Sequence, residues 1–125
     1  MNRAGLTAHI QTVYGVEPDF PFEGDAVSAV FRRTDNRKWF ALVMRLPAER
    51  LGISGGMLDV VNLKCDPLMI GSLLAEPGFF PAYHMNKERW ISAALDSGIP
   101  DALLTALIVQ SYALTAPRKK RRSEA

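Results

Sequence analysis

One short stretch, residues 81–90, places more hydrogen-bond donors beside aromatic surface than any other part of the chain. It contains one of the two histidines, His84, followed by Asn86 and Lys87. All three side chains can donate to phosphate oxygens, so they predict a contact surface for an anion or a nucleic-acid backbone. Lys64, at the end of a predicted strand, is expected to join this basic cluster. The alternative is a structural turn in which Asn86 caps the backbone, Lys87 is solvated and His84 bonds a carbonyl group.

A second group of cations surrounds a predicted turn at residues 34–37. Its members are Arg32, Arg33, Arg37 and Lys38. Four cations around one hairpin could lie beside phosphates as a wing. The alternative is that these charges keep an edge strand soluble and prevent it from pairing with another chain.

The third group of cations is the C-terminal tail. It consists of Arg118, Lys119, Lys120, Arg121 and Arg122. The whole chain has 15 basic and 13 acidic residues, a net charge of +2, whereas residues 1–116 have 10 basic and 12 acidic residues, a net charge of −2. The tail fits a nonspecific nucleic-acid arm or a solubilising end. Affinity from so short a run would fall steeply with salt, because each neutralised phosphate adds roughly one unit to the log–log slope.

Groups that could catalyse or bind a metal ion are few and scattered. Cys65 is the single cysteine, so the chain has no intramolecular disulfide, and we expect it on the inward face of its strand as a buried structural residue. The carboxylate nearest to His84 in sequence is Glu88. Gly55 and Gly56 precede a strand rather than a helix, so they do not make a phosphate loop. We therefore expect no enzyme, no metal site and no cofactor.

Hydrophobic periodicity predicts the elements that must position these groups. Apolar residues at helical spacing predict a first helix over residues 3–14. A second helix is expected to start at Asp66-Pro67, because an N-cap carboxylate before proline favours a first turn. A third helix is expected to start at Pro100-Asp101. Alternation predicts five extended segments, which are residues 27–33, 38–46, 57–65, 79–85 and 90–95.

Alternation also predicts the side of each strand that faces the core. In residues 38–46, one face is expected to carry Phe40, Leu42 and Met44, and the other Trp39, Ala41 and Val43. In residues 57–65, one face is expected to carry Val61, Leu63 and Cys65, and the other Val60, Asn62 and Lys64. Because the second of these faces ends in polar residues, we expect a sheet packed on one side and solvated on the other. Trp90 is expected in the core.

The predicted order is helix, three strands, helix, two strands, helix. Short turns between consecutive strands favour an antiparallel sheet packed on one face by helices, an α+β fold. Residues 1–116 are predicted to form one domain, and residues 117–125 a basic, disordered terminus. No apolar run approaches the ~20 residues that span a bilayer, and no signal-peptide pattern opens the chain, so we expect a cytoplasmic monomer without membrane contact.

Several short runs, in their order and spacing, resemble one family. They are Phe20-Pro21-Phe22, Lys38-Trp39-Phe40-Ala41, Asn62-Leu63-Lys64-Cys65-Asp66-Pro67, Tyr83-His84-Met85-Asn86-Lys87, Trp90-Ile91 and Ser111-Tyr112. Together they resemble the MmcQ/YjbR family over about residues 14–114. The resemblance implies a CyaY-like (frataxin-like) α/β sandwich and a DNA-binding protein, sometimes described as a double-wing arrangement. The loop at residues 47–56 is longer than the family's usual connection, and the basic tail lies outside the shared pattern.

The resemblance to a frataxin-like fold raises the question of iron binding, which needs a row of carboxylates on an exposed helix. The predicted first helix has no Asp or Glu between Met1 and Val16, so the fold analogy does not carry iron binding to this chain. The leading hypothesis is weak, mostly phosphate-directed DNA binding. The alternative is a non-catalytic binding module that recognises a small anionic ligand or a protein partner through the surface from His84 to Lys87.

Overall fold

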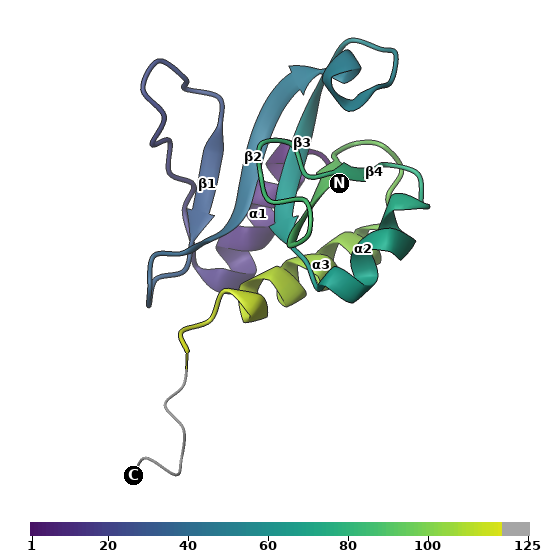
Figure 1. The fold of residues 1–125 in the computed structure, drawn as a ribbon. Coiled ribbons are helices and arrows are strands. Elements are labelled where there is room, and N and C mark those ends of the chain that lie inside the picture. The colour runs from purple at the N-terminus through teal and green to yellow at the C-terminus, as the bar shows by residue number, and fades with distance from the viewer. Residues whose placement is uncertain (119–125) are drawn as a thin grey trace.

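A computed structural model describes residues 1–118, in which three helices lie against one face of a five-stranded sheet (Figure 1). The helices are α1 (Arg3–Tyr14), α2 (Pro67–Leu74) and α3 (Asp101–Leu114), with a short 3-10 helix η1 (Ala48–Leu51). The strands are β1 (Ala29–Arg32), β2 (Trp39–Pro47), β3 (Met57–Lys64), β4 (Phe79–Pro81) and β5 (Trp90–Ala94). They are ordered β1-β2-β3-β5-β4, and every neighbouring pair is antiparallel. This arrangement confirms the predicted α+β fold.

Local sequence signals explain where the first two helices begin. The Asn2 side chain accepts a hydrogen bond of 2.8 Å from the Gly5 N–H and caps α1. The Asp66 carboxylate accepts one of 2.9 Å from the Leu68 N–H, and Pro67 occupies the first position of α2, as predicted. Gly15 ends α1 in the left-handed region, at φ 66°, which glycine adopts without steric cost.

The hydrophobic core lies between the sheet and the three helices. Its fully buried members come from segments far apart in the sequence and include Leu6, Ile10, Phe31, Phe40, Leu63, Ile91, Leu104 and Ile108. Val61, Leu63 and Cys65 share the core side of the β3 segment, as alternation predicts. Burial of each large apolar side chain contributes about 1.5–3 kcal/mol, so this layer is the main source of stability.

A β-bulge makes the prediction for the faces of β2 wrong. The register runs from Phe31 opposite Ala41 directly to Arg32 opposite Trp39, so Phe40 is an extra residue. A bulge breaks the strict alternation of side chains because two residues oppose one. Phe40 therefore joins Ala41 in the core instead of sharing a face with Leu42 and Met44. Trp39, Leu42 and Met44 instead line one hollow, on the sheet face turned away from the helices, here called the outer face.

The outer face was expected to be solvated, but the loop at residues 82–89 covers part of it. Asn62 and Ser92 are both completely buried beneath this loop. The Asn62 amide donates to the Tyr83 carbonyl oxygen at 2.8 Å, and the Ser92 hydroxyl accepts from the Tyr83 N–H at 2.9 Å. The same hydroxyl donates to the Asn62 side-chain oxygen. These three residues are here called the loop anchor. Their polar groups form hydrogen bonds with one another, so they can be buried on a sheet face that the alternation of side chains predicted to be solvated.

Two further expectations fail at the ends of this loop. The extended segment predicted over residues 79–85 stops at Pro81, and the chain then turns, with His84 in the left-handed region at φ 60°. Trp90 lies outside the core cluster and is half-buried, because Ile91 takes the core side of β5 and alternation turns Trp90 to the outer face. Among residues 1–118, the structure has no helix with the length and hydropathy needed to cross a bilayer.

Candidate functional site

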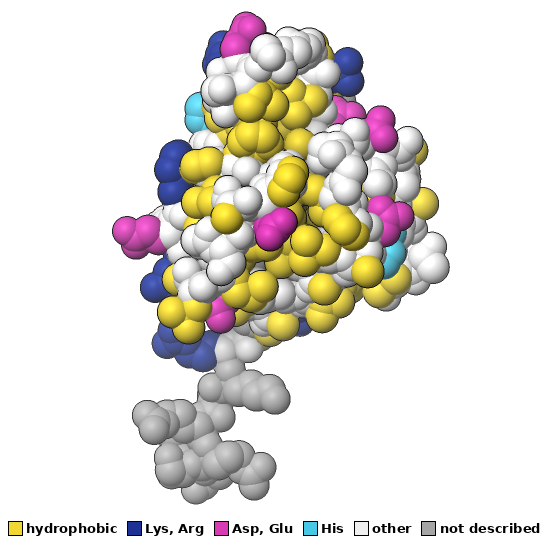
Figure 2. All heavy atoms as spheres, turned by 90° about the vertical axis from the view of Figure 1, so that its right-hand side faces the viewer, with side chains coloured by type: hydrophobic (Ala, Val, Ile, Leu, Met, Phe, Trp, Pro, Cys, Tyr) yellow, Lys and Arg dark blue, Asp and Glu magenta, His cyan; other side chains and the backbone are white. Residues whose placement is uncertain are grey.

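Four strands bring their ends together at one end of the sheet. Because neighbouring strands are antiparallel, β1 and β3 end where β2 and β5 begin, with Arg32 opposite Trp39 and Lys64 opposite Trp90. We call this region the basic end, and its exposed or half-exposed cations are Arg32, Arg37, Lys38, Lys64, Arg89 and Arg118. Figure 2 views the side of α2 and β4, where hydrophobic side chains predominate and Lys and Arg side chains follow the left edge. That edge corresponds to the front of Figure 1, where the outer face lies.

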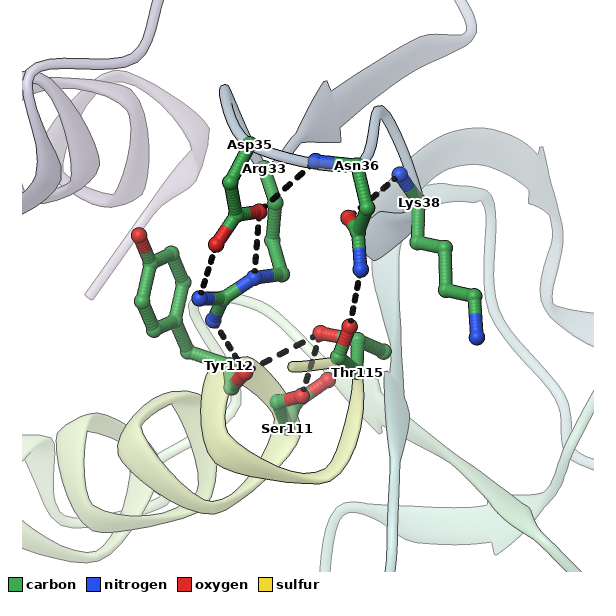
Figure 3. A network of polar contacts seen from close by, with 7 residues as sticks. All are labelled: Arg33, Asp35, Asn36, Lys38, Ser111, Tyr112 and Thr115. Atoms are coloured by element: carbon green, nitrogen blue, oxygen red, sulfur yellow. Dashed lines mark hydrogen bonds and ion pairs between the residues drawn. The ribbon is translucent and has the colours of Figure 1, made fainter. Parts of the chain in front are cut away.

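A partly buried polar cluster holds the turn between β1 and β2 against the end of α3 (Figure 3). The Arg33 guanidinium donates to both carboxylate oxygens of Asp35, at 3.0 and 2.8 Å, and to the Tyr112 carbonyl oxygen at 2.6 Å. It also lies 3.8 Å from the centre of the Tyr112 ring. The Asn36 amide donates to the Thr115 carbonyl oxygen at 2.8 Å. We call these five residues the turn clasp, since they join segments that are 79 positions apart.

The turn clasp decides which hairpin cations can meet a ligand. Arg33 is only 8% exposed, and its guanidinium is fully engaged in the clasp. Its hydrogen bond to Asp35 lowers the pKa of that carboxyl group below the usual range. Arg32 forms an ion pair of 3.1 Å with Asp19 and lies over the Trp39 ring. Arg33 is therefore structural, and Arg32 is partly neutralised.

Of the remaining hairpin cations, Arg37 lines a small hollow together with Glu17 and Asp19. Lys38 is exposed and forms no ion pair with any residue from 1 to 118. Lys38 is therefore the hairpin cation best placed to contact an anion.

Lys64 belongs to the basic end and not to the loop at residues 82–89. Its backbone N–H donates to the Ser111 hydroxyl at 2.9 Å, and that hydroxyl donates to the Phe40 carbonyl oxygen at 2.6 Å. This backbone bond fixes the end of β3 against α3. The side chain is half-exposed, and it forms no ion pair within the part of the chain that the structure describes.

The three predicted contact residues of the loop at residues 82–89, His84, Asn86 and Lys87, have separate roles. His84 is exposed, and its ring centre lies 4.0 Å from that of Tyr83. The Asn86 side chain accepts the Glu88 N–H at 2.8 Å, which is the local cap that the structural alternative predicts. The Lys87 ammonium donates to the Ala82 carbonyl oxygen at 3.0 Å. The expected single surface is therefore divided, because Lys87 and His84 line two different hollows and Lys64 lines neither of them.

His84 helps to form a hollow on the outer face that we call the outer groove. It has a volume of about 290 Å³. Its apolar and aromatic lining residues are Phe22, Trp39, Leu42, Met44, His84 and Met85. Asp25 also lines it, and no Lys or Arg from the described part of the chain does. Hydrogen bonds from Ser28 and Val27 lower the pKa of the Asp25 carboxyl group, so the groove carries a fixed negative charge at neutral pH.

Lys87 helps to form a different hollow, here called the cationic hollow, with a volume of about 260 Å³. Arg50 lines it too and donates a hydrogen bond of 3.0 Å to the Tyr83 hydroxyl. No Asp or Glu of residues 1–118 lines it. Sequence reasoning missed Arg50, although the long loop at residues 47–56 that carries it was the available signal.

The structure describes the environment of the single cysteine and of the possible metal ligands among residues 1–118. Cys65 is 2% exposed, as expected of a structural cysteine, and burial raises the pKa of its thiol. Among residues 1–118, no three His, Cys, Asp or Glu side chains are grouped closely enough to hold a metal ion. The predicted contacts at Lys119, Lys120, Arg121 and Arg122 lie outside the described residues.

Sequence comparison identifies the family to which the chain belongs. The sequence model of the YjbR family matches residues 11–114, most of the folded chain. The chain belongs to the YjbR family. Its YjbR relatives include the uncharacterised protein YyaQ of Bacillus subtilis strain 168, which is 39% identical over 116 residues, or 92% of this chain and 98% of YyaQ. The uncharacterised protein YbdF of Escherichia coli O157:H7 is 40% identical over 67 residues, or 51% of this chain and 53% of YbdF.

Solved structures show the same fold. A crystal structure of a Pseudomonas syringae protein has a TM-score of 0.90 and 44% identity, covering 93% of this chain and all of that one. A Deinococcus radiodurans protein has a TM-score of 0.70 and 23% identity, covering 98% of this chain and 84% of that one. At that identity the second comparison supports the fold alone. The relatives thus establish family and architecture, and the function has to be argued from the surface.

Proposed function

We propose that this YjbR-family protein is a cytoplasmic, non-catalytic protein that binds DNA weakly, mostly through the phosphate backbone, at the basic end. One observation carries the proposal: Lys38 and Lys64 lie at the same end of the sheet, and α3 ends there too, at Leu114, shortly before Arg118. None of the three forms an ion pair with any residue from 1 to 118. Ammonium and guanidinium groups that form no ion pair attract phosphate groups, and this attraction does not depend on the base sequence.

The charge distribution sets the strength of this binding. Residues 1–116 carry a net charge of −2, so the folded body as a whole does not attract DNA. The tail that follows α3 adds four further cations, Lys119, Lys120, Arg121 and Arg122, next in sequence to Arg118. The basic end would provide a local contact, and the tail would provide most of the long-range attraction.

A salt titration tests the proposal. Labelled duplex DNA is titrated with the full chain, with residues 1–116, and with Lys38→Ala and Lys64→Ala variants at several salt concentrations. Each lysine variant should reduce the slope of log K against log salt by about 1 if that lysine contacts a phosphate. Lys87→Ala is the matched control, because it removes an exposed lysine from outside the basic end and should leave the slope unchanged. Absence of binding by residues 1–116 even at low salt would refute a role for the folded body.

The cationic hollow supports a second candidate, the binding of a small anionic ligand. Arg50, Lys87 and the Tyr83 hydroxyl provide three donors around a concave surface that no carboxylate lines. Phosphate, sulfate and small dicarboxylates should raise the melting temperature at constant ionic strength. Lys87→Ala should abolish this rise and leave DNA binding intact. Equal shifts in the parent and the variant would exclude this site.

A further inference from the structure

We propose that the outer groove binds an organic cation, specifically a methylated or quaternary ammonium group. The inference does not depend on DNA binding, because the groove shares no lining residue with the cations of the basic end. It rests on three properties of the groove: its charge, its aromatic lining and its size.

The charge of the groove favours a cation. Asp25 lines it with a carboxylate that accepts two backbone hydrogen bonds of 2.9 Å, from Val27 and Ser28, which hold it in place. Among residues 1–118, no Lys or Arg lines the groove. The nearby guanidinium of Arg32 is partly neutralised by its ion pair with Asp19. An anionic ligand would meet repulsion from Asp25, whereas a cation would meet attraction.

The aromatic and sulfur-containing lining favours a weakly hydrated cation over an ordinary ammonium ion. Trp39 and Phe22 meet edge to face with ring centres 5.8 Å apart, and Met44 and Met85 add polarizable thioethers. Aromatic faces attract methylated ammonium groups, which lose little hydration on entering such a site. Within this structure the Trp39 ring already attracts a cation, because the Arg32 guanidinium carbon lies 5.6 Å from its centre.

The size of the groove limits the ligand to one small group. Its volume of about 290 Å³ is at the lower limit of ligand pockets, which span roughly 300–1,000 Å³. The walls come from the loop that carries Phe22 and Asp25 and from the loop that carries His84 and Met85. The loop anchor holds the second wall to the sheet, so the groove is largely preformed.

A matched pair of probes separates cation recognition from simple apolar binding. The full-length chain is titrated at pH 8 with choline and with its neutral carbon isostere, 3,3-dimethylbutan-1-ol, and binding is followed by backbone amide NMR. Choline should bind in the millimolar range and shift the amides of the groove residues. The isostere should bind about tenfold more weakly, since it lacks the charge that Trp39 and Asp25 recognise. Equal binding of the two probes, or shifts confined to other surfaces, would overturn the proposal.

Variants locate the interaction. Trp39→Leu should lower choline affinity about tenfold, whereas Trp39→Phe keeps an aromatic face and should lose less. Asp25→Asn should weaken choline binding without changing that of the neutral isostere. Glu76→Gln removes an exposed carboxylate outside the groove and should have no effect. If Trp39→Leu does not fold, the Asp25→Asn comparison decides alone, and equal losses for the two probes would refute charge recognition.

Discussion

The basic end and the outer groove lie on adjoining parts of one molecule but differ in charge and in support. The basic end presents cations from strand ends, held by the turn clasp around Arg33. The outer groove presents aromatic rings and the Asp25 carboxylate, and the loop anchor at Asn62 supports one of its walls. Each region depends on a different buried polar network. The two surfaces should therefore respond to mutation separately, and opposite charges should give them different ligands.

The largest expected effect comes from breaking the turn clasp. Arg33→Ala removes three charge-assisted hydrogen bonds and the contact with the Tyr112 ring, so it should lower the free energy of unfolding by about 3 kcal/mol. Urea denaturation measures this loss. Arg33→Lys is the matched control, and it should recover only part of the stability because an ammonium group cannot replace the planar fork. Amide exchange should increase around the hairpin and leave the loop at residues 82–89 protected. A loss below about 0.5 kcal/mol would show that the clasp is not a structural support.

Breaking the loop anchor should increase amide exchange around the loop at residues 82–89 and leave the hairpin protected. Asn62→Ala leaves the Tyr83 carbonyl without its donor and the Ser92 hydroxyl without its acceptor, and it should lower the free energy of unfolding by about 2 kcal/mol. The Tyr83 N–H should then exchange faster with solvent, whereas amides of the turn clasp should not. Combining Asn62→Ala with Ser92→Ala should give less than the sum of the single losses, since the two side chains form one network. An additive double variant would contradict that coupling.

The pH dependence of stability should test the two regions, because each contains one carboxylate with a lowered pKa. The pKa of Asp35 is lowered chiefly by its hydrogen bond from Arg33, and that of Asp25 chiefly by hydrogen bonds from Ser28. A lowered pKa in the folded state stabilises the protein above the ordinary carboxyl value of about 4, and this stability disappears as the pH falls through the folded value. Urea midpoints measured from neutral to strongly acidic pH should therefore fall less steeply for Asp35→Asn and Asp25→Asn than for the parent. A variant whose acid profile matches that of the parent would show that its carboxylate contributes nothing.

The sequence predicted the parts of the fold that depend on local signals. The cap at Asp66 and the buried side of β3 follow from short-range patterns, and both are correct. The bulge at Phe40 had no such signal, because both faces of β2 are apolar near it, so a slip of one residue exposes no polar group in the pattern. Asn62 was interpreted as solvent-facing, since its partner Tyr83 lies 21 positions away and alternation cannot reveal a covering loop.

The candidate site was harder to predict than the fold for a related reason. Arg33 and Lys38 are equally basic in sequence, and only the contact with Tyr112, 79 positions away, separates a structural cation from an exposed one. Lys64 was grouped with His84 and Lys87 by the type of side chain. The strand register places it instead beside Trp90 at the basic end. Long-range pairing, which composition does not encode, therefore decides which charges act together.

The smallest expected effect on stability distinguishes the Lys64 side chain from its backbone. Lys64→Ala should change the free energy of unfolding by less than about 0.5 kcal/mol, because the half-exposed ammonium group forms no ion pair with any residue from 1 to 118. Ser111→Ala should cost about 1–2 kcal/mol, since it leaves the Lys64 N–H and the Phe40 carbonyl without their shared partner. If Lys64→Ala proves as destabilising as Ser111→Ala, the lysine supports the fold, and the DNA contact proposed for the basic end loses one of its three cations.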